Sequence, residues 1–451
     1  MASKIKKNTS NKAAYLAYGD FVYLHEPVPI FKNAQGPILE DTEGYKYFDA
    51  EAANGTASLG FDSSILQTAC NKVEQISSIP SFCETELRLE VAERIGRKIK
   101  NITGEKGKVA FELGGAQGIE LALKVVKSNT KKSQLVVFEG GYHGRSIYTS
   151  QLSASHRYRA LMGDWRVPLI RLPYPDYEQS ALAHDRRAWK KQTLAYIQQL
   201  AELEVGGMVS RSGNQDIAAL IIEPLLNAGG IVKPDKDFIE EIVRLFRKLG
   251  ALIVVDEIFC GFYRTGKMFG FQHYNFMPDI VVMSKAITNG ITPLSCVWAK
   301  DPYMLPENFP PGTHSATYIN NPFAMAVAST VLDRYEQWTS IDRDIARLET
   351  SLNNVITEIV EKSKVAKSGF ALGGVGRILL KDHVAGKILD IARTVGRKNP
   401  INGFHGLILA STGMSPNVVA INPPLNLKSD EIIALKSLLT KTFEKAENVL
   451  A

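Results

Sequence analysis

Short apolar runs alternate with longer amphipathic segments along most of this chain. The runs at residues 251–255 and 280–283 are rich in β-branched residues and bounded by turn residues, so we predict buried strands of a parallel sheet. Further buried strands are predicted at residues 109–111, 135–138 and 217–222. The pattern indicates an α/β fold in which helices cover both faces of a mostly parallel sheet.

Amphipathic helices are predicted between and after these strands, because apolar residues recur there at helical spacing. The predicted helices are residues 84–99, 238–249, 324–335, 345–360 and 429–449. A hairpin is predicted at residues 37–48, around an Asp-Thr-Glu-Gly turn. Four glycines between residues 369 and 376 lie outside any strand-to-helix frame, so we predict turns there rather than a nucleotide-binding loop.

The order of these elements indicates one large α/β domain with smaller terminal parts. We expect an N-terminal segment at residues 1–58 that belongs to a small domain. The large domain is expected at residues 59–325, and the rest of the small domain at residues 326–451. Residues 178–216 have a charged, glutamine-rich composition. We interpret them as a surface insertion, and we identify no catalytic or binding motif in them.

The composition is ordinary for a soluble globular protein, with 45% apolar and 22% charged residues. The net charge of +6 is small and diffuse, so it does not indicate nucleic-acid binding. No apolar run is long enough to cross a bilayer, and the lysine-rich residues 1–12 lack the apolar core of a secretory signal. The four cysteines show no metal-like spacing and fit a reducing compartment, so we expect a cytoplasmic protein without a metal site.

Candidate chemistry lies at the carboxyl ends of the two central strands, where ligands gather in open α/β sheets. Asp256 follows the first of these strands, and Lys285 follows the second. A carboxylate for a cationic ring nitrogen and a lysine for a Schiff base are the pair that pyridoxal phosphate chemistry needs. Taken alone, an aspartate here is more often a helix N-cap, and a lysine more often a solvated surface residue.

An ordered set of motifs surrounds this pair. It comprises Asp256-Glu257-Ile258, Gly261-Phe-Tyr-Arg264-Thr265-Gly266, Pro278-Asp279-Ile280 and Ser284-Lys285 with Gly290. In this order and spacing the motifs resemble the signature of class III aminotransferases, also called omega-aminotransferases, which are pyridoxal-phosphate enzymes of fold type I. The resemblance implies a seven-stranded, mostly parallel sheet in the large domain, a small α/β domain built from both termini, and a homodimer.

The resemblance also implies roles for the residues around the cofactor. Lys285 would form the Schiff base and, once displaced by the substrate amine, move the proton between substrate carbon and cofactor. Asp256 would keep the pyridine nitrogen protonated, and Ile258 would pack under the ring. Tyr142 matches the aromatic residue that stacks on the ring, and His143 follows it as a support.

Four further residues would bind the phosphate or the substrate. The backbone amides of Gly115 and Ala116, at a glycine-rich helix start, match the family's phosphate cradle. Thr317 matches a threonine that reaches the cofactor phosphate of the neighbouring subunit. Glu223 matches a glutamate near the substrate side of the cofactor, although a structural role as a turn or cap acceptor is about equally compatible.

Several positions depart from the family pattern. Gly114 and Gln117 stand where relatives have a serine and an acidic residue, so a hydroxyl contact to the phosphate is lost. Phe259 replaces a glutamine that bonds the cofactor's phenolic oxygen. Ala420 replaces an arginine that binds a substrate carboxylate, so we expect the favoured amine to lack a carboxylate at this spot. If the shortened C-terminal region shifts the alignment with the family, another arginine, such as Arg377, could bind the substrate carboxylate instead.

The sequence therefore predicts a pyridoxal-5′-phosphate-dependent aminotransferase acting on small molecules. It would move an amino group from a primary amine or amino acid to a keto or aldehyde acceptor. A racemase, epimerase or aminomutase of the same superfamily is the alternative, since it would use the same lysine and aspartate. A catalytically silent scaffold is disfavoured by the presence of both Asp256 and Lys285. A pyridoxamine form accumulating with an amine donor alone would favour transamination, and solvent deuterium in recovered substrate would favour racemisation.

Overall fold

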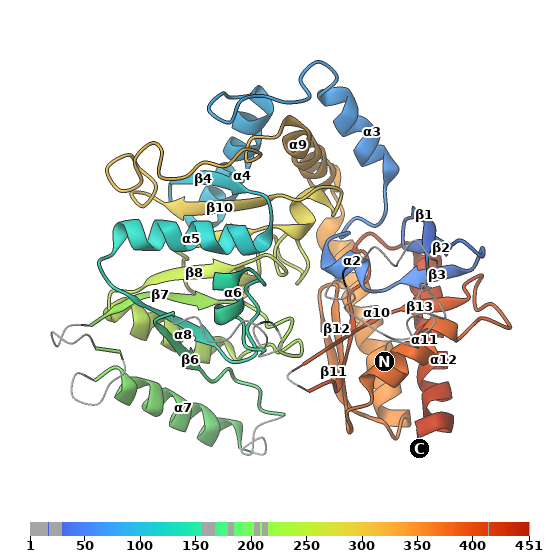
Figure 1. The fold of residues 1–451 in the computed structure, drawn as a ribbon. Helices are drawn as coiled ribbons and strands as arrows, with labels where there is room; N and C mark the ends of the chain where they lie inside the picture. The colour runs from blue at the N-terminus through green and yellow to red at the C-terminus, as the bar shows by residue number, and fades with distance from the viewer. Residues whose placement is uncertain are drawn as a thin grey trace.

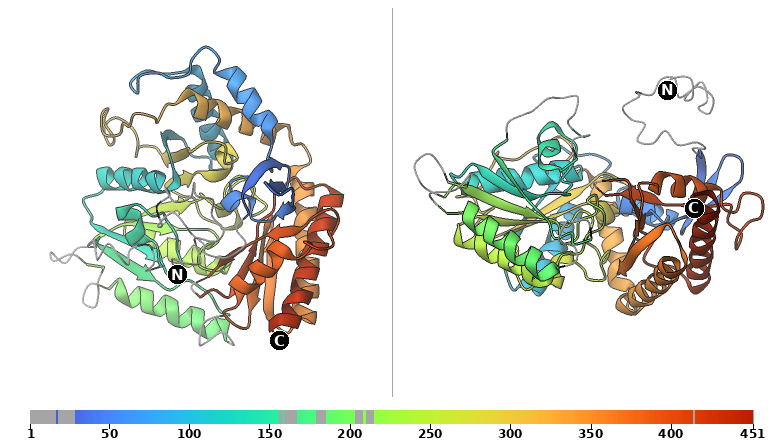
Figure 2. Two further views of the ribbon diagram at one scale, coloured as in Figure 1. Left: turned by 45° about the vertical axis from the view of Figure 1, so that its right-hand side comes forward. Right: turned by 90° about the horizontal axis from the view of Figure 1, so that it is seen from below.

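The computed structural model describes residues 17, 29–155, 158, 167–178, 185–202, 208–209, 215–413 and 415–450. Within these residues the chain forms a large part around one central sheet and a smaller part with two further sheets (Figure 1). Figure 2 shows the two parts side by side from two other directions. The lysine-rich residues 1–12 lie outside the described residues, as do residues 179–184, 203–207 and 210–214 of the expected insertion at 178–216.

The central sheet is built from seven strands. They are β4 (Gly107–Glu112), β5 (Gln134–Phe138), β6 (Leu169–Leu172), β7 (Ile217–Ile222), β8 (Leu252–Asp256), β9 (Ile280–Met283) and β10 (Ser295–Lys300). Their spatial order is β4-β10-β9-β8-β7-β5-β6. β10 runs antiparallel to its neighbours β4 and β9, and the other pairs are parallel. The prediction of a mostly parallel sheet is therefore confirmed.

Helices and short turns connect the strands. They are α2 (Ala52–Gly55), α3 (Ser63–Lys72), α4 (Glu86–Thr103), α5 (Gly115–Asn129), α6 (Ile147–Leu152), α7 (Arg186–Leu200), α8 (Lys236–Lys248), η4 (Gly270–His273), η5 (Lys285–Thr288), α9 (Pro322–Gln337), α10 (Ile341–Lys362), α11 (Ala385–Thr394) and α12 (Ser429–Leu450). The predicted helices correspond to α4, α8, α9, α10 and α12, so all of them are confirmed. Among the helices in the described part of the chain, none combines the length and apolar character that a bilayer crossing requires.

The central sheet separates two apolar cores because successive side chains of a strand point to opposite faces. Ile253 and Val255 of β8 belong to the core that also contains apolar residues of α4 and α8. Val254, between them, belongs to the second core, which contains apolar residues of α5. Both faces of β8 are thus covered, which explains why its sequence is a continuous apolar run rather than an alternating one.

Two four-stranded sheets make up the smaller part. One contains β1 (Phe31–Gln35), β2 (Ile38–Asp41), β3 (Lys46–Asp49) and β13 (Gly406–Ile408), and the other contains β11 (Ala366–Leu372), β12 (Val375–Leu380), β15 (Val418–Ile421) and β14 (Ala410–Thr412). The predicted hairpin is present as β2 and β3. β3 pairs with β13, so segments from both ends of the chain share one sheet. The domain boundaries near residues 58 and 325 stay a prediction.

The glycines between residues 369 and 376 do not all lie in turns, which corrects our expectation. Gly373, with a φ of +56°, turns the hairpin between β11 and β12. Gly369 and Gly376 instead lie within these two strands. A Cβ atom at Gly369 would lie 2.4 Å from Cγ2 of Ile356 in α10, so the helix packs directly on the strand backbone. Glycine spacing alone cannot distinguish such close packing from a turn.

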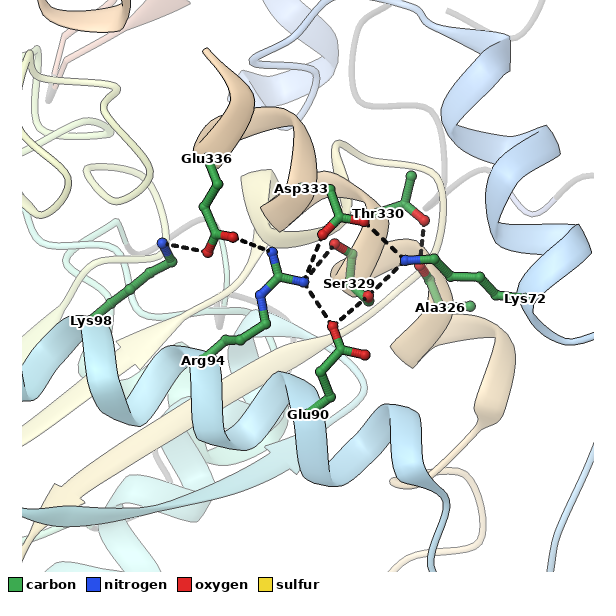
Figure 3. Close-up of polar contacts among 9 residues, drawn as sticks. All are labelled: Lys72, Glu90, Arg94, Lys98, Ala326, Ser329, Thr330, Asp333 and Glu336. Atoms are coloured by element: carbon green, nitrogen blue, oxygen red, sulfur yellow. Dashed lines mark hydrogen bonds and ion pairs between the residues drawn. The ribbon is translucent and has the colours of Figure 1, made fainter. Parts of the chain in front are cut away.

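A network of charged side chains ties α4 to α3 and α9 (Figure 3). Nη1 of Arg94 lies 2.8 Å from Asp333, and Nη2 donates to Glu336 at 2.8 Å. Lys98 also contacts Glu336 at 2.8 Å. The Arg94 side chain is only 16% exposed, so solvent screens its ion pairs less than those of a typical surface arginine.

Replacing Arg94 by methionine should lower the free energy of unfolding by about 1–2 kcal/mol. Methionine keeps much of the apolar stem but leaves the carboxylates of α4 and α9 without their shared cation. Urea denaturation followed by circular dichroism measures the change. Arg97→Met is the matched control, because Arg97 is 74% exposed and its ion pair is with Glu93. Its effect should stay below about 0.5 kcal/mol, and equal losses in both variants would contradict the prediction.

Candidate active site

The carboxyl ends of β8 and β9 lie side by side because these strands are parallel neighbours. Asp256, the last residue of β8, is in register with Val282 of β9. Lys285 follows β9 after a single intervening residue, Ser284. The fold therefore places the carboxylate and the amine at one edge of the sheet, as expected from the two apolar runs that precede them.

The backbone of Lys285 is strained. Its φ of +50° lies in the left-handed region, which costs a residue other than glycine on the order of 1–3 kcal/mol and is typical of functional sites. The preceding Ser284 is anchored by its hydroxyl, which donates to the Leu294 carbonyl at 2.8 Å. The Nζ atom of Lys285 lies 5.1 Å from the ring centroid of Phe259. The strained turn thus holds the amine over an aromatic face.

The electrostatic environment of Lys285 favours its neutral form. Burial lowers the pKa of the amine, and this effect exceeds the opposing influence of the Glu51 and Asp256 carboxylates. A lower pKa leaves more of the amine unprotonated at neutral pH, which both a nucleophile and a general base require. Burial also raises the pKa of Glu51 to about 7.

Asp256 is buried, and both of its carboxylate oxygens have partners. Oδ1 accepts the backbone N–H of Ile258 at 3.0 Å, and Oδ2 lies 2.9 Å from Nδ1 of His143. Burial acts to lower the pKa of His143, but the hydrogen bond and charge of Asp256 outweigh it, so the pKa is raised. His143 therefore donates a hydrogen bond that fixes the orientation of the Asp256 carboxylate.

His143 has a larger part in this arrangement than the sequence analysis assigned to it. The side chain is 2% exposed, and its backbone N–H donates to Oγ of Ser153 at 2.9 Å. The residue lies in the loop that follows β5, and β5 ends at the same edge of the sheet as β8. A polar residue after a predicted parallel strand is the signal that could have placed His143 near Asp256.

The N-terminus of α5 presents backbone donors at the same edge. Gly114 is its N-cap in an extended conformation, and no side chain within the described residues caps the first turn. The amides of Gly115 and Ala116 have no partner within the helix, and the positive end of the helix dipole adds to their attraction for an anion. A Cβ atom at Gly115 would lie 3.1 Å from Cδ1 of Ile258, so this turn contacts the segment after Asp256.

Tyr142 is half-buried beside His143. Its ring meets the ring of Tyr158 edge to face, with 5.4 Å between centroids. The guanidinium of Arg145 lies 4.5 Å from the centroid of Tyr158 and 5.8 Å from that of Tyr142. These contacts restrict the Tyr142 ring in the loop that follows β5, where it was expected to stack on a planar ligand.

Glu223, at the end of β7, binds backbone amides. Its Oε1 accepts the N–H of Tyr142 at 2.8 Å, and Oε2 accepts the N–H of Asn227 at 3.5 Å. Burial raises the pKa of Glu223 to about 7, and the nearby His143 acts in the opposite direction. Of the two roles considered for this residue, these contacts favour the structural one. A role in substrate binding stays a prediction.

A segment of the smaller part packs against Phe259. Residues 52–55 have φ values of 49°, 50°, 62° and 73°, which form a left-handed turn. A Cβ atom at Gly55 would lie 2.8 Å from Cε2 of Phe259. On another side, Phe259 packs in an apolar cluster with Leu225 and Ala420. Phe259 therefore fills the space beside Lys285 with an apolar ring, where a glutamine would have offered a hydrogen bond.

Thr317 lies on an exposed loop. Its side chain makes no hydrogen bond to any other residue that the structure describes, and the neighbouring Tyr318 is 61% exposed. The loop is anchored at His314, whose Nε2 lies 3.0 Å from the carbonyl oxygen of Phe111. Thr317 is therefore accessible for contact with a second copy of the chain.

The groups at the sheet edge fit a phosphorylated aromatic aldehyde. Lys285 offers an amine with a lowered pKa to the aldehyde, and the Asp256–His143 pair offers a carboxylate to a ring nitrogen. The uncapped start of α5 offers backbone donors to a phosphate. Among the described residues, no cluster of histidine, cysteine, aspartate and glutamate forms a metal site.

Comparisons with known proteins give a family and a fold for this chain. The family "Aminotransferase class-III" matches residues 23–443. The chain is 26% identical to the acetylornithine aminotransferase of Streptococcus mutans serotype c, over 92% of this chain and 96% of that one. It is 28% identical to the alanine/serine racemase of Pyrococcus horikoshii, over 98% and 92% of the two chains. The crystal structure of an amine transaminase from an uncultivated Pseudomonas species, in a PLP-bound form, has the same fold, with a TM-score of 0.84, 21% identity and coverage of 97% and 100%.

Proposed function

Because the chain belongs to the class-III aminotransferase family, we propose that the edge of the sheet around Lys285 is its active site. The protein is a pyridoxal-phosphate-dependent aminotransferase. We propose that Lys285 holds the cofactor covalently, that Asp256 binds its ring nitrogen, and that the amides of Gly115 and Ala116 bind its phosphate. The observation that carries the proposal is the placement of Lys285 and the Asp256–His143 pair at the ends of adjacent parallel strands.

Pyridoxal phosphate, when bound, supplies an electron sink for negative charge at the amino-bearing carbon of the substrate. The Asp256 carboxylate, oriented by His143, would stabilise the positive charge on the ring nitrogen. The Lys285 amine would take the proton from the amino-bearing carbon of the substrate and deliver it to the cofactor. Ile258 and Tyr142 would contact the two faces of the ring and exclude water from it.

The proposed reaction moves an amino group from a primary amine or amino acid to a keto or aldehyde acceptor. Adding amines singly to the purified enzyme should bleach the visible absorption of the bound cofactor, and a keto acid should then restore it. The absence of bleaching with every amine tested would count against this reaction.

The four cysteines are all free, which supports our proposal of a reducing compartment such as the cytoplasm.

Racemisation is the second candidate, because one relative that matches nearly the whole chain is named an alanine/serine racemase. Lys285 and Asp256 would serve both reactions. Incubation with an amino acid in deuterium oxide separates the two. Deuterium in recovered substrate without net keto product would support a racemase, whereas stoichiometric transfer of the amino group to an added keto acid would support an aminotransferase.

We further propose a homodimer in which Thr317 of each protomer reaches the cofactor phosphate of the other. The exposed position of Thr317 and the lack of a hydroxyl at Gly114 support this proposal. Replacing Thr317 by valine should weaken cofactor binding by about tenfold or more, since a hydrogen bond to a charged phosphate is lost. Absorption titration of the apoenzyme with pyridoxal phosphate measures the change.

Thr313→Val is the matched control, because Thr313 is exposed on the same loop. It should leave cofactor affinity unchanged within about twofold. Sedimentation of the wild type should show a dimer. A fully active monomer, or equal effects of the two valine variants, would exclude the shared site.

A further inference from the structure

Arg377 is a buried arginine with an unpaired hydrogen-bonding edge. Its side chain is 3% exposed, and Nη1 lies 3.0 Å from Oε2 of Glu178. Nε and Nη2 have no hydrogen-bond partner among the residues that the structure describes. The Nε atoms of four other arginines are also buried without a partner, but among the described residues Arg377 alone leaves a buried Nη2 unpaired as well. The desolvation of both donors is then uncompensated. These two atoms therefore point to a ligand.

The unpaired atoms have the geometry of a carboxylate site. Nε and Nη2 of an arginine lie on the same side of the planar guanidinium, and their N–H groups are nearly parallel. Such an edge matches the two oxygens of a carboxylate, which it binds with a pair of hydrogen bonds. Nη1, on the far side, remains with Glu178 and fixes the plane of the group.

The register of the small sheet places Arg377 close to the proposed active site. In β12 it lies opposite Phe370 of β11 and Ala420 of β15. Directly opposed residues of antiparallel strands share one face of a sheet. Both neighbours pack in the apolar cluster that contains Phe259, and the ring of Phe259 lies 5.1 Å from Nζ of Lys285.

The other face of the same strands is covered by α10. A Cβ atom at Gly376, the residue before Arg377, would lie 3.2 Å from Cδ1 of Ile356 in that helix. Because side chains alternate along a strand, Arg377 is directed away from α10. Figure 1 shows β11 and β12 on the side of the smaller part that faces the central sheet.

We propose that Arg377 binds a carboxylate of the substrate through Nε and Nη2, so that the amino donor is an amino acid rather than a simple amine. This inference rests on the proposed active site at Lys285. It replaces the expectation drawn from Ala420, which is apolar itself but has a guanidinium directly opposite on the same face. Sequence position alone could not place the two residues together.

Two matched substrate pairs test the proposal. L-alanine carries a carboxylate on its amino-bearing carbon, where isopropylamine carries a methyl group. γ-Aminobutyrate carries a carboxylate at the end of the chain distant from the amine, where butylamine carries a methyl group. Arg377→Met should lower kcat/KM for the carboxylate-bearing member of one pair by about a hundredfold or more. The partner of that pair that lacks the carboxylate should change by less than about threefold. The responding pair identifies the carboxylate that is bound, whereas equal effects within both pairs would overturn the proposal.

A binding measurement separates this proposal from the proposed reaction. Propionate and butyrate are the deaminated forms of the two amino acids. By isothermal titration calorimetry, the wild-type holoenzyme should bind at least one of them, and Arg377→Met should weaken that binding by about tenfold or more. No binding to the wild type would overturn the role of Arg377. Binding without bleaching by any amine would instead support Arg377 and count against the aminotransferase reaction at this site.

Two further variants serve as controls, one for folding and one for the geometry of recognition. Arg377→Met leaves Glu178 without its partner, so the double variant Arg377→Met/Glu178→Gln removes both charges and provides a folded alternative. Arg377→Lys keeps the positive charge but lacks the paired N–H edge. Lysine should restore less than about a tenth of the lost kcat/KM, and full restoration would contradict two-point recognition.

Discussion

Replacing Lys285 by alanine should lower turnover by roughly 10⁴-fold or more, since the residue has two tasks in the proposed site. It holds the cofactor, and its amine moves the proton at the substrate carbon. The lowered pKa suits the amine to both tasks. Turnover is measured as amino transfer under saturating cofactor, so that weak cofactor retention does not mimic a loss of chemistry. Reduction of the wild-type enzyme with borohydride, followed by peptide mapping, should place the cofactor label on Lys285.

Lys267→Ala provides the control for this experiment. Lys267 is an exposed lysine in the loop that follows Asp256, so its loss should change turnover by less than about twofold. A borohydride label on any lysine other than Lys285 would refute the assignment. Near-normal turnover of Lys285→Ala would refute it equally.

The central part of the fold could be predicted because its elements bury side chains with a fixed period. β8 is apolar up to its last residue, Asp256, since both of its faces are covered, and α8 has an apolar stripe that packs on the sheet. The region from residue 363 to 413 was harder, because β11 and β12 contain glycines and β13 and β14 are only three residues long. Pairings such as β3 with β13 join residues far apart in the chain, and local pattern does not specify them.

The same limit applied to individual site residues. Asp256 and Lys285 could be identified because each lies at or just after the carboxyl end of a recognisable strand, within an ordered set of motifs that resembles a known family. His143 was given too small a part because its partner Asp256 lies 113 residues further along the chain. Arg377 was named only as an alternative, since its place opposite Ala420 depends on the register of two strands. Position at a strand end can be predicted locally, whereas the partner of a buried polar group depends on the assembled sheet.

Substitution of Asp256 by asparagine should lower kcat by about a hundredfold or more and leave the fold intact. Asparagine has nearly the same volume and retains an oxygen that can accept a hydrogen bond from His143 or from the Ile258 amide. It carries no negative charge, so nothing in the site would then stabilise a protonated ring nitrogen. Steady-state amino transfer gives kcat, and thermal unfolding of the variant shows whether the structure is kept.

His143→Gln separates the charge of Asp256 from its orientation. Glutamine removes the imidazole that holds Oδ2 but leaves the carboxylate in place, so kcat should fall by only about tenfold. Near-normal turnover of Asp256→Asn would exclude an electrostatic role for this carboxylate. Equal losses in the two variants would show instead that the contact between Asp256 and His143, rather than the charge directed at the ring nitrogen, limits catalysis.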